Sequence, residues 1–270
     1  PIVARLMVNR NIDCDEGHRF LEGTLKDLLD PFLLKDMETA VALILETIEA
    51  KKSIVVYGDY DVDGITATSL LYRFLVKMGA RVSYYIPERQ SEGYGLNLEA
   101  LEHIISDGAS LVITVDCGIS SYDIVEAVCD RIDIIITDHH TAPPQIPPAR
   151  AVINHKQPDC PYTDKNLSGV GVAFKLCQAL WLRQCGEWYL DDLDIVALGT
   201  VADVVPLVGE NRIIVQAGLK KMNELPNLGI DKLIDVAGLH DKTITAGHIG
   251  FTLAPRLNAA GRVTHATRAV

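Results

Sequence analysis

Short apolar runs that alternate with segments of helical spacing constrain the fold of this chain more than any other feature. Three of these runs span residues 53–57, 111–115 and 132–137. They are apolar on both sides rather than alternating with polar residues, which indicates strands that are buried on both faces. Helical patterns at 64–78 and 120–130 lie between the runs. The sequence therefore predicts an α/β fold in which helices flank a parallel sheet.

The remaining elements divide the chain into three regions. We expect further helices at 37–50 and 96–106 and further strands at 81–86 and 151–154. After residue 169 the pattern becomes mostly helical, with helices expected at 170–184, 190–201, 211–222 and 229–237. These observations predict an N-terminal segment with a helix (1–50), an α/β sheet domain (51–155) and a mostly helical part (156–270).

The composition narrows the class of protein. A net charge of -11 over 270 residues argues against a protein that coats nucleic acid non-specifically, but it is compatible with an enzyme whose acidic side chains bind metal ions. No apolar run approaches the roughly 20 residues that span a bilayer. No signal-peptide pattern opens the chain either, so we expect a cytoplasmic protein with no membrane partner. The six cysteines form no CxxC pair, which predicts reduced thiols rather than a structural zinc site.

Acidic and histidine side chains follow the predicted strands. In chain order they are Asp59, Asp61, Asp63, Asp116, Asp138, His139, His140 and, after a predicted helix, Asp203. Because parallel strands end at one edge of a sheet, we expect the strand-borne clusters to meet in one crevice. Carboxylate and imidazole ligands in this mixture suit pairs of Mn²⁺ or Mg²⁺ ions, which are typical of phosphoryl chemistry.

Two other interpretations of the first cluster are weaker. Asp59-x-Asp61-x-Asp63-Gly64 matches the opening of an EF-hand loop, but the twelfth position, which needs a bidentate Glu, is Leu70. Asp61 or Asp63 could instead cap the helix that begins at Gly64. A single cap explains one carboxylate rather than three, and three close carboxylates repel one another unless a cation lies between them.

Six motifs in this order resemble the DHH phosphoesterase superfamily, and within it the RecJ-like family of bacterial single-strand-specific 5′→3′ exonucleases. The motifs occupy 58–64 (GDYDVDG), 115–120 (VDCGIS), 136–140 (ITDHH), 167–174 (LSGVGVAF), 197–206 (ALGTVADVVP) and 255–262 (PRLNAAGR). The resemblance runs from about residue 50 to the end of the sequence. It implies metal-dependent hydrolysis of single-stranded DNA to 5′-mononucleotides, in DNA repair and recombination.

The resemblance also implies roles for individual residues. The implied ligands of two Mn²⁺ or Mg²⁺ ions are Asp59, Asp61, Asp63, Asp116, His139 and Asp203. The implied catalytic residues are Asp59, Asp138 and His140, with His140 in contact with the scissile phosphate and steadying the charge of the leaving group. Many members of the superfamily have a histidine where this chain has Tyr57, which leaves one metal position with fewer nitrogen ligands.

Two polar segments are candidates for holding the substrate. The implied substrate-binding residues are Arg89, Gly93, Tyr94 and Gly95 in the first segment, and Arg256, Asn258 and Arg262 in a polar loop near the end. In the RecJ-like interpretation, Arg89 and Arg262 hold phosphates near the 5′ end. The alternatives are a glycine-rich connection with a surface arginine, and surface charge pairing. Single-stranded DNA is the implied partner, with a single-strand-binding protein and a helicase as further partners.

Three functional hypotheses follow. The first is the single-strand-specific exonuclease. The second is a phosphodiesterase of the same superfamily that acts on short oligonucleotides or cyclic dinucleotides. The third is an inactive replication scaffold of the same fold, against which the retained carboxylates argue. The sequence shows no Gly-Gly-His motif of the second superfamily domain and no evident oligonucleotide-binding barrel. We therefore expect the catalytic half alone, with the part at 156–270 completing it.

Overall fold

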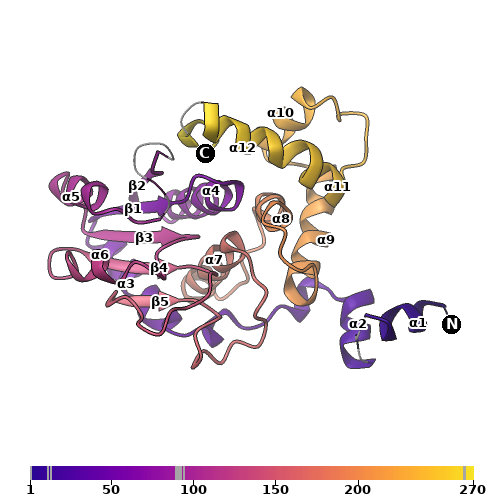
Figure 1. Ribbon diagram of the computed structural model, residues 1–270, viewed down its shortest axis with the longest axis horizontal. Coiled ribbons are helices and arrows are strands. Elements are labelled where there is room, and N and C mark those ends of the chain that lie inside the picture. Colours follow the sequence, from indigo (N-terminus) through magenta and orange to yellow (C-terminus); the bar gives the residue numbers. More distant parts are fainter. Residues whose placement is uncertain (1, 11, 13, 89–92, 94, 264–265) are drawn as a thin grey trace.

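Five parallel strands form a single sheet, which lies in the left part of Figure 1. The computed structural model describes residues 2–10, 12, 14–88, 93, 95–263 and 266–270 (Figure 1). The strands are β1 (Ser53–Gly58), β2 (Arg81–Tyr85), β3 (Leu111–Val115), β4 (Asp133–Thr137) and β5 (Ala151–Ile153). Their order in the sheet is β2-β1-β3-β4-β5, and every neighbouring pair is parallel. The predicted α/β class is confirmed.

Helices cover both faces of this sheet. The first face carries α3 (Met37–Glu49), α4 (Val62–Lys77) and α7 (Gly169–Cys185), and the second carries α5 (Leu98–Ser106) and α6 (Tyr122–Glu126). Along β1, Ile54 and Val56 pack into the first core, whereas Val55 and Tyr57 pack into the second. Successive side chains of a strand point to opposite faces, so a strand covered on both faces must be apolar throughout.

The C-terminal part is built mostly of helices. They are α8 (Leu193–Ala202), α9 (Gly209–Glu224), α10 (Leu228–Val236), α11 (Ala246–His248), a π-helical turn (Ile249–Leu253) and α12 (Ala254–Val263). Helix α8 packs against α4, α7 and α9, which joins this part to the sheet domain. Helix α12 crosses above the gap between α4 and α8 in Figure 1 and contacts both.

The N-terminal segment begins far from the sheet, at the right of Figure 1. It forms α1 (Ile2–Val8) and α2 (Cys14–Glu22), then short 3₁₀ turns at Leu25–Asp27 and Pro31–Leu33. A buried ion pair anchors it: Lys175 Nζ lies 2.5 Å from Glu210 Oε1, and the same oxygen accepts a hydrogen bond from the backbone of Leu29 at 2.8 Å. Tyr162 donates its hydroxyl hydrogen to the other oxygen of Glu210.

The prediction of a polar loop near the end of the chain is wrong. Arg256, Asn258 and Arg262 belong to helix α12. Pro255 argues for a loop because proline has no N–H to donate and crowds the preceding turn of a helix. Ala254 separates the π-helical turn Ile249–Leu253 from this proline, which is the second residue of α12. Proline is tolerated in the first turn of a helix, so the helix can begin here. In the described part of the chain, no helix is long and apolar enough to span a bilayer.

Candidate metal centre

The structure gathers the candidate metal ligands at the carboxyl edge of the sheet. Asp59 follows β1, Asp116 follows β3, and His139 stands two residues beyond β4. The possible ligand atoms form three groups, and within each group all lie within 4.8 Å of one another. The groups are Asp116, His139 and His140; Asp63, His139 and Asp203; and Asp59, Asp61 and Asp116. Since the groups share members, they form one cluster, which we call the acidic centre.

His139 lies in the middle of the acidic centre. Its Nε2 is 3.1 Å from Asp116 Oδ1 and 3.9 Å from Asp63 Oδ2, and its Nδ1 is 3.7 Å from Asp203 Oδ2. The ring is buried, and neither nitrogen has a hydrogen-bond partner among the described residues. Buried polar atoms without partners are costly, and they are rare unless an ion or water satisfies them. Convergent carboxylate oxygens around an imidazole therefore fit a divalent cation.

Burial strongly perturbs the carboxyl groups of the acidic centre. It raises the pKa of Asp59 to about 7 and that of Asp203 to about 6, and the negative charge of Asp61 adds to both shifts. Burial and neighbouring carboxylates also raise the pKa values of Asp63 and Asp116 well above the ordinary value for aspartate. Without a cation these groups retain protons that a bound divalent ion would displace.

Burial has the opposite effect on the imidazole. It lowers the pKa of His139 to about 4, which keeps the ring neutral near pH 7. The neutral ring is the form that binds metals.

Helix α7 contributes its N-terminus to the acidic centre. The backbone N–H groups of Gly169 and Val170 donate to the two carboxylate oxygens of Asp63, at 2.6 and 2.9 Å. A side chain at Gly169 would place its Cβ 2.4 Å from Asp116 Oδ1, so only glycine allows this approach. The helix is capped by Ser168, which accepts a hydrogen bond from Gly171. Sequence reasoning missed these contacts, although the motif at 167–174 with its capping serine and two glycines was their signal.

Two residues, one in the acidic centre and one beside it, have a strained backbone conformation. Asp116 has φ 61°, and Val204, next to Asp203, has φ 63°. Aspartate tolerates this left-handed region, but a β-branched valine rarely adopts it. Strain of this kind persists where surrounding structure enforces it, most often at functional sites.

Asp61 caps a helix and also lies among the candidate metal ligands, two arrangements that the sequence left open. Its Oδ1 accepts a hydrogen bond from Gly64 N at 2.9 Å, so it is the N-cap of α4. It also groups with Asp59 and Asp116, and Asp59 Oδ1 has no hydrogen-bond partner among the described residues. The segment follows a strand, as β1 shows, rather than the first helix of an EF-hand.

Asp138 holds the histidine loop in place. Its Oδ1 accepts hydrogen bonds from His139 N at 2.7 Å and His140 N at 3.0 Å, and its Oδ2 accepts one from Ile119 N at 2.9 Å. His140 Nδ1 lies 2.8 Å from the same Oδ1, and this hydrogen bond raises the pKa of His140. Both oxygens of Asp138 thus accept hydrogen bonds from the protein, and its carboxylate holds His140 in place.

Tyr57 packs into the second core of the sheet and belongs to none of the groups of candidate metal ligands. Its hydroxyl donates to Gly95 O at 3.1 Å and accepts from Asn97 Nδ2 at 3.2 Å. Gly93 and Gly95 have φ values of 81° and 82°, which glycine adopts readily. Tyr57 therefore holds the chain before α5.

The structure places only part of the predicted substrate-binding set. Arg89 and Tyr94 lie outside the described residues, as does the side chain of Arg262. Arg256 and Asn258 lie on α12, which contacts the two helices that carry Asp63 and lead to Asp203. The guanidinium of Arg256 donates to Thr252 O at 2.7 Å and is otherwise exposed.

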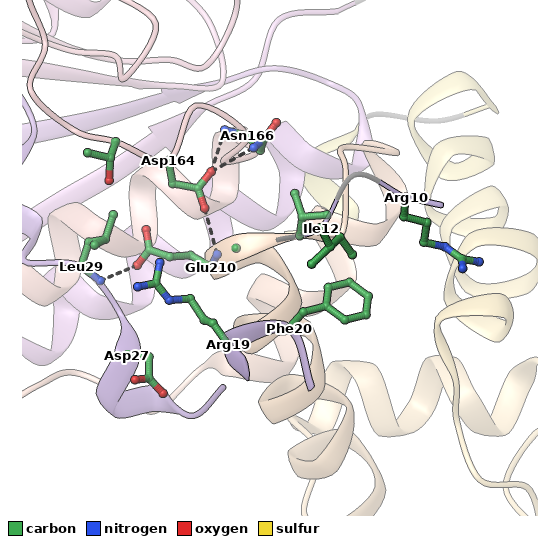
Figure 2. A pocket seen from close by; sticks show the side chains of 12 residues that line it. Arg10, Ile12, Arg19, Phe20, Asp27, Leu29, Asp164, Asn166 and Glu210 are labelled. Carbon is green, nitrogen blue, oxygen red and sulfur yellow. Dashed lines mark hydrogen bonds between the residues drawn. The ribbon is translucent and has the colours of Figure 1, made fainter. Parts of the chain in front are cut away.

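A pocket of about 340 Å³ lies elsewhere, between the N-terminal segment and the start of α9 (Figure 2). Its acidic groups are already engaged, because Asp164 accepts from Glu210 N at 2.9 Å and from Asn166 N at 3.0 Å. None of the candidate metal ligands lines it. Its lining includes Arg19 and Phe20, from the segment before residue 50, and it is distinct from the acidic centre.

Comparisons with known proteins agree with this geometry. Residues 53–200 match the family described as DHH family, N-terminal domain. Over 272 residues the chain is 44% identical to the single-stranded-DNA-specific exonuclease RecJ of Bacillus subtilis (strain 168), covering 100% of this chain and 34% of that protein. The resemblance to RecJ-like exonucleases is thereby confirmed.

Two solved structures are similar in fold. Exonuclease RecJ bound to manganese gives a TM-score of 0.79 at 37% identity, over 87% of this chain and 60% of that one. RecJ in complex with Mn²⁺ from Thermus thermophilus gives 0.78 at 33% identity, over 100% of this chain and 40% of that one. The chain thus spans about a third to three fifths of the length of these relatives.

Proposed function

The chain belongs to the DHH family, and we propose that it is the catalytic core of a metal-dependent exonuclease that degrades single-stranded DNA from its 5′ end to 5′-mononucleotides. One observation carries the proposal: carboxylates and imidazoles from separate strands and helices converge in overlapping groups, within each of which the ligand atoms lie within 4.8 Å of one another. At the centre, both nitrogens of the buried His139 ring lack hydrogen-bond partners among the described residues. The similarity to RecJ exonucleases, two of them solved with manganese, supports the choice of reaction and metal.

Six residues would hold two Mn²⁺ or Mg²⁺ ions: Asp59, Asp61, Asp63, Asp116, His139 and Asp203. When bound, the ions supply Lewis-acid activation of water and neutralisation of the charge that develops on the phosphate. The N-terminus of α7 fixes the carboxylate of Asp63, so that its geometry is set before substrate arrives. The buried, neutral ring of His139 lies between the carboxylate of Asp116, on its Nε2 side, and that of Asp203, on its Nδ1 side.

His140 would act on the phosphate itself. The hydrogen bond with Asp138 fixes Nδ1 and raises the pKa of the imidazole. Nε2 is then the atom from which a hydrogen bond or a proton would be donated to a phosphate oxygen. A donor held in place before the reaction stabilises developing charge at little reorganisation cost.

We propose further that Arg89 and Arg262 hold phosphates near the 5′ end, with Gly93, Tyr94, Gly95, Arg256 and Asn258 lining the path of the strand. The division at residues 50 and 155 is proposed to separate an N-terminal segment, the sheet domain and the helical part of the core. We also propose action in the cytoplasm in DNA repair and recombination, beside a single-strand-binding protein and a helicase.

The test is a digestion ladder. Chelator-stripped protein is mixed with Mn²⁺ and 3′-labelled single-stranded DNA, a matched blunt duplex, or a cyclic dinucleotide. We expect shortening from the 5′ end of the single strand, release of mononucleotides, and weaker cleavage in the Arg89→Ala and Arg262→Ala variants. The logarithm of the binding constant falls linearly with the logarithm of the salt concentration. Each lost phosphate contact should make that slope shallower by about 0.7.

The other outcomes of the digestion would contradict the polarity, the strand preference or the activity itself. Shortening from the 3′ end or equal attack on the duplex would overturn the polarity or the strand preference. Hydrolysis of the cyclic dinucleotide alone would favour the phosphodiesterase alternative. No hydrolysis of any substrate with Mn²⁺ would favour the inactive scaffold.

A further inference from the structure

A lysine stands beside the histidine loop at a position fixed by the sheet. Strands β4 and β5 are parallel, with Thr137 paired to Ile153. The pairing continues one step further, because Asp138 N donates to Ile153 O at 3.1 Å. His140 lies three residues after the end of β4, and Lys156 lies three residues after the end of β5. Both therefore follow the carboxyl edge of the sheet, where the acidic centre lies.

A buried side chain ties these two positions together. Asn154 is fully buried. Its Nδ2 donates to the carbonyl oxygen of His140 at 2.9 Å, and its Oδ1 accepts from Lys156 N at 2.7 Å. One amide thus hydrogen-bonds to the backbones of both residues. The backbone of Lys156 is therefore held beside that of His140, and its side chain extends from this point.

The ammonium group of Lys156 has no ionic partner among the described residues, and the backbone of Lys156 lies at the edge of the sheet that carries the acidic centre. The side chain of Lys156 is exposed, and it makes no ion pair with any described acidic group.

We propose that Lys156 binds a phosphate oxygen of the nucleic-acid strand beside His140, an inference that rests on the proposed function. A phosphodiester brings a negative charge to each linkage, and an exposed ammonium beside the centre is complementary to it. Lysine is a flexible point charge that does not depend on the identity of the base, so the contact would hold the backbone without reading sequence.

The test compares Lys156→Gln with Lys156→Arg and with a matched control, Lys52→Gln. Lys52 is also exposed and makes no ion pair with a described residue, but it precedes β1 and lies at the opposite edge of the sheet. Binding of a fluorescently labelled oligothymidylate is measured by anisotropy with Ca²⁺ over a range of salt. Cleavage of the same strand is measured with Mn²⁺, together with the affinity for Mn²⁺ in the absence of DNA.

We expect Lys156→Gln to weaken binding and lower kcat/KM by about ten- to one-hundred-fold, which is what a hydrogen bond between charged groups contributes. The slope of log binding constant against log salt concentration should become shallower by about 0.7 in this variant. Lys156→Arg should keep most of the affinity, and Lys52→Gln should match the wild type.

Two results would overturn the assignment. In the first, Lys156→Gln behaves as Lys52→Gln does in both assays, which would make Lys156 an ordinary solvated charge. In the second, DNA binding is unchanged while Mn²⁺ affinity changes, which would mean that the lysine acts on the metal ligands alone. A wild-type protein that neither binds nor cleaves single-stranded DNA would instead refute the proposed function.

Discussion

Asp59→Asn should stabilise the metal-free protein at neutral pH. Burial is the main cause that raises the pKa of this carboxyl from 3.8 to about 7. A shift of this size corresponds to about 4 kcal/mol between the folded and unfolded states. Because neighbouring carboxyl groups share protons with Asp59, we expect the measured gain to be about 2–4 kcal/mol. The side chain is 1% exposed, so solvent screens this effect little.

The pH dependence follows from the direction of the shift. The folded-state pKa is raised, so the folded protein binds the proton of Asp59 more tightly than the unfolded chain does. The stability that this proton provides is complete below about pH 4 and is lost as the pH rises through about 7. The advantage of Asp59→Asn should therefore be small near pH 4 and should reach its full size near pH 8.

Urea unfolding of chelator-treated protein, followed by circular dichroism between pH 4 and 8, measures this difference. The control is Asp130→Asn, an exposed aspartate outside the acidic centre, which should show no such trend. Added Mn²⁺ should reverse the order at pH 8, because it binds the wild-type carboxylates more tightly. A difference that stays flat across this range, or a variant that is less stable at pH 8 without metal, would refute the electrostatic reasoning.

Other predictions concern the site and its support. Asp116→Ala should abolish Mn²⁺-dependent hydrolysis while leaving the circular dichroism spectrum intact; unchanged turnover after chelator stripping would contradict the two-ion assignment. His140→Ala should lower the rate by about 10²–10³ with little loss of Mn²⁺ affinity, whereas His139→Ala should damage both; calorimetric titration with equal losses would show that the roles are misassigned. Gly169→Ala should weaken Mn²⁺ binding by about 10–100-fold, since its Cβ would meet Asp116 Oδ1 at 2.4 Å, and wild-type affinity would exclude that contact. Glu210→Ala should cost about 3–5 kcal/mol in urea unfolding because it leaves a buried ammonium unpaired, and a loss below about 1 kcal/mol would mean that the ion pair is solvated.

Local sequence patterns determined the sheet, most helices and the identity of the acidic centre. Strand β3 begins and ends at the residues expected from its apolar run, and helix α3 ends one residue before its expected end. These features depend on contiguous residues, whose periodicity and caps act at short range. The convergence of the clusters was also predictable, because parallel strands end at one edge whatever their order.

Only the tertiary structure decided how the acidic centre is held. The contact from Gly169 to Asp63 joins residues 106 positions apart, and no local pattern specifies which helix end meets which carboxylate. The same is true of Asn154, which holds His140 and Lys156 together only because β5 lies beside β4. Such contacts depend on how helices and strands pack against one another. Packing is set by the whole core at once, so these roles appear only when the chain is folded.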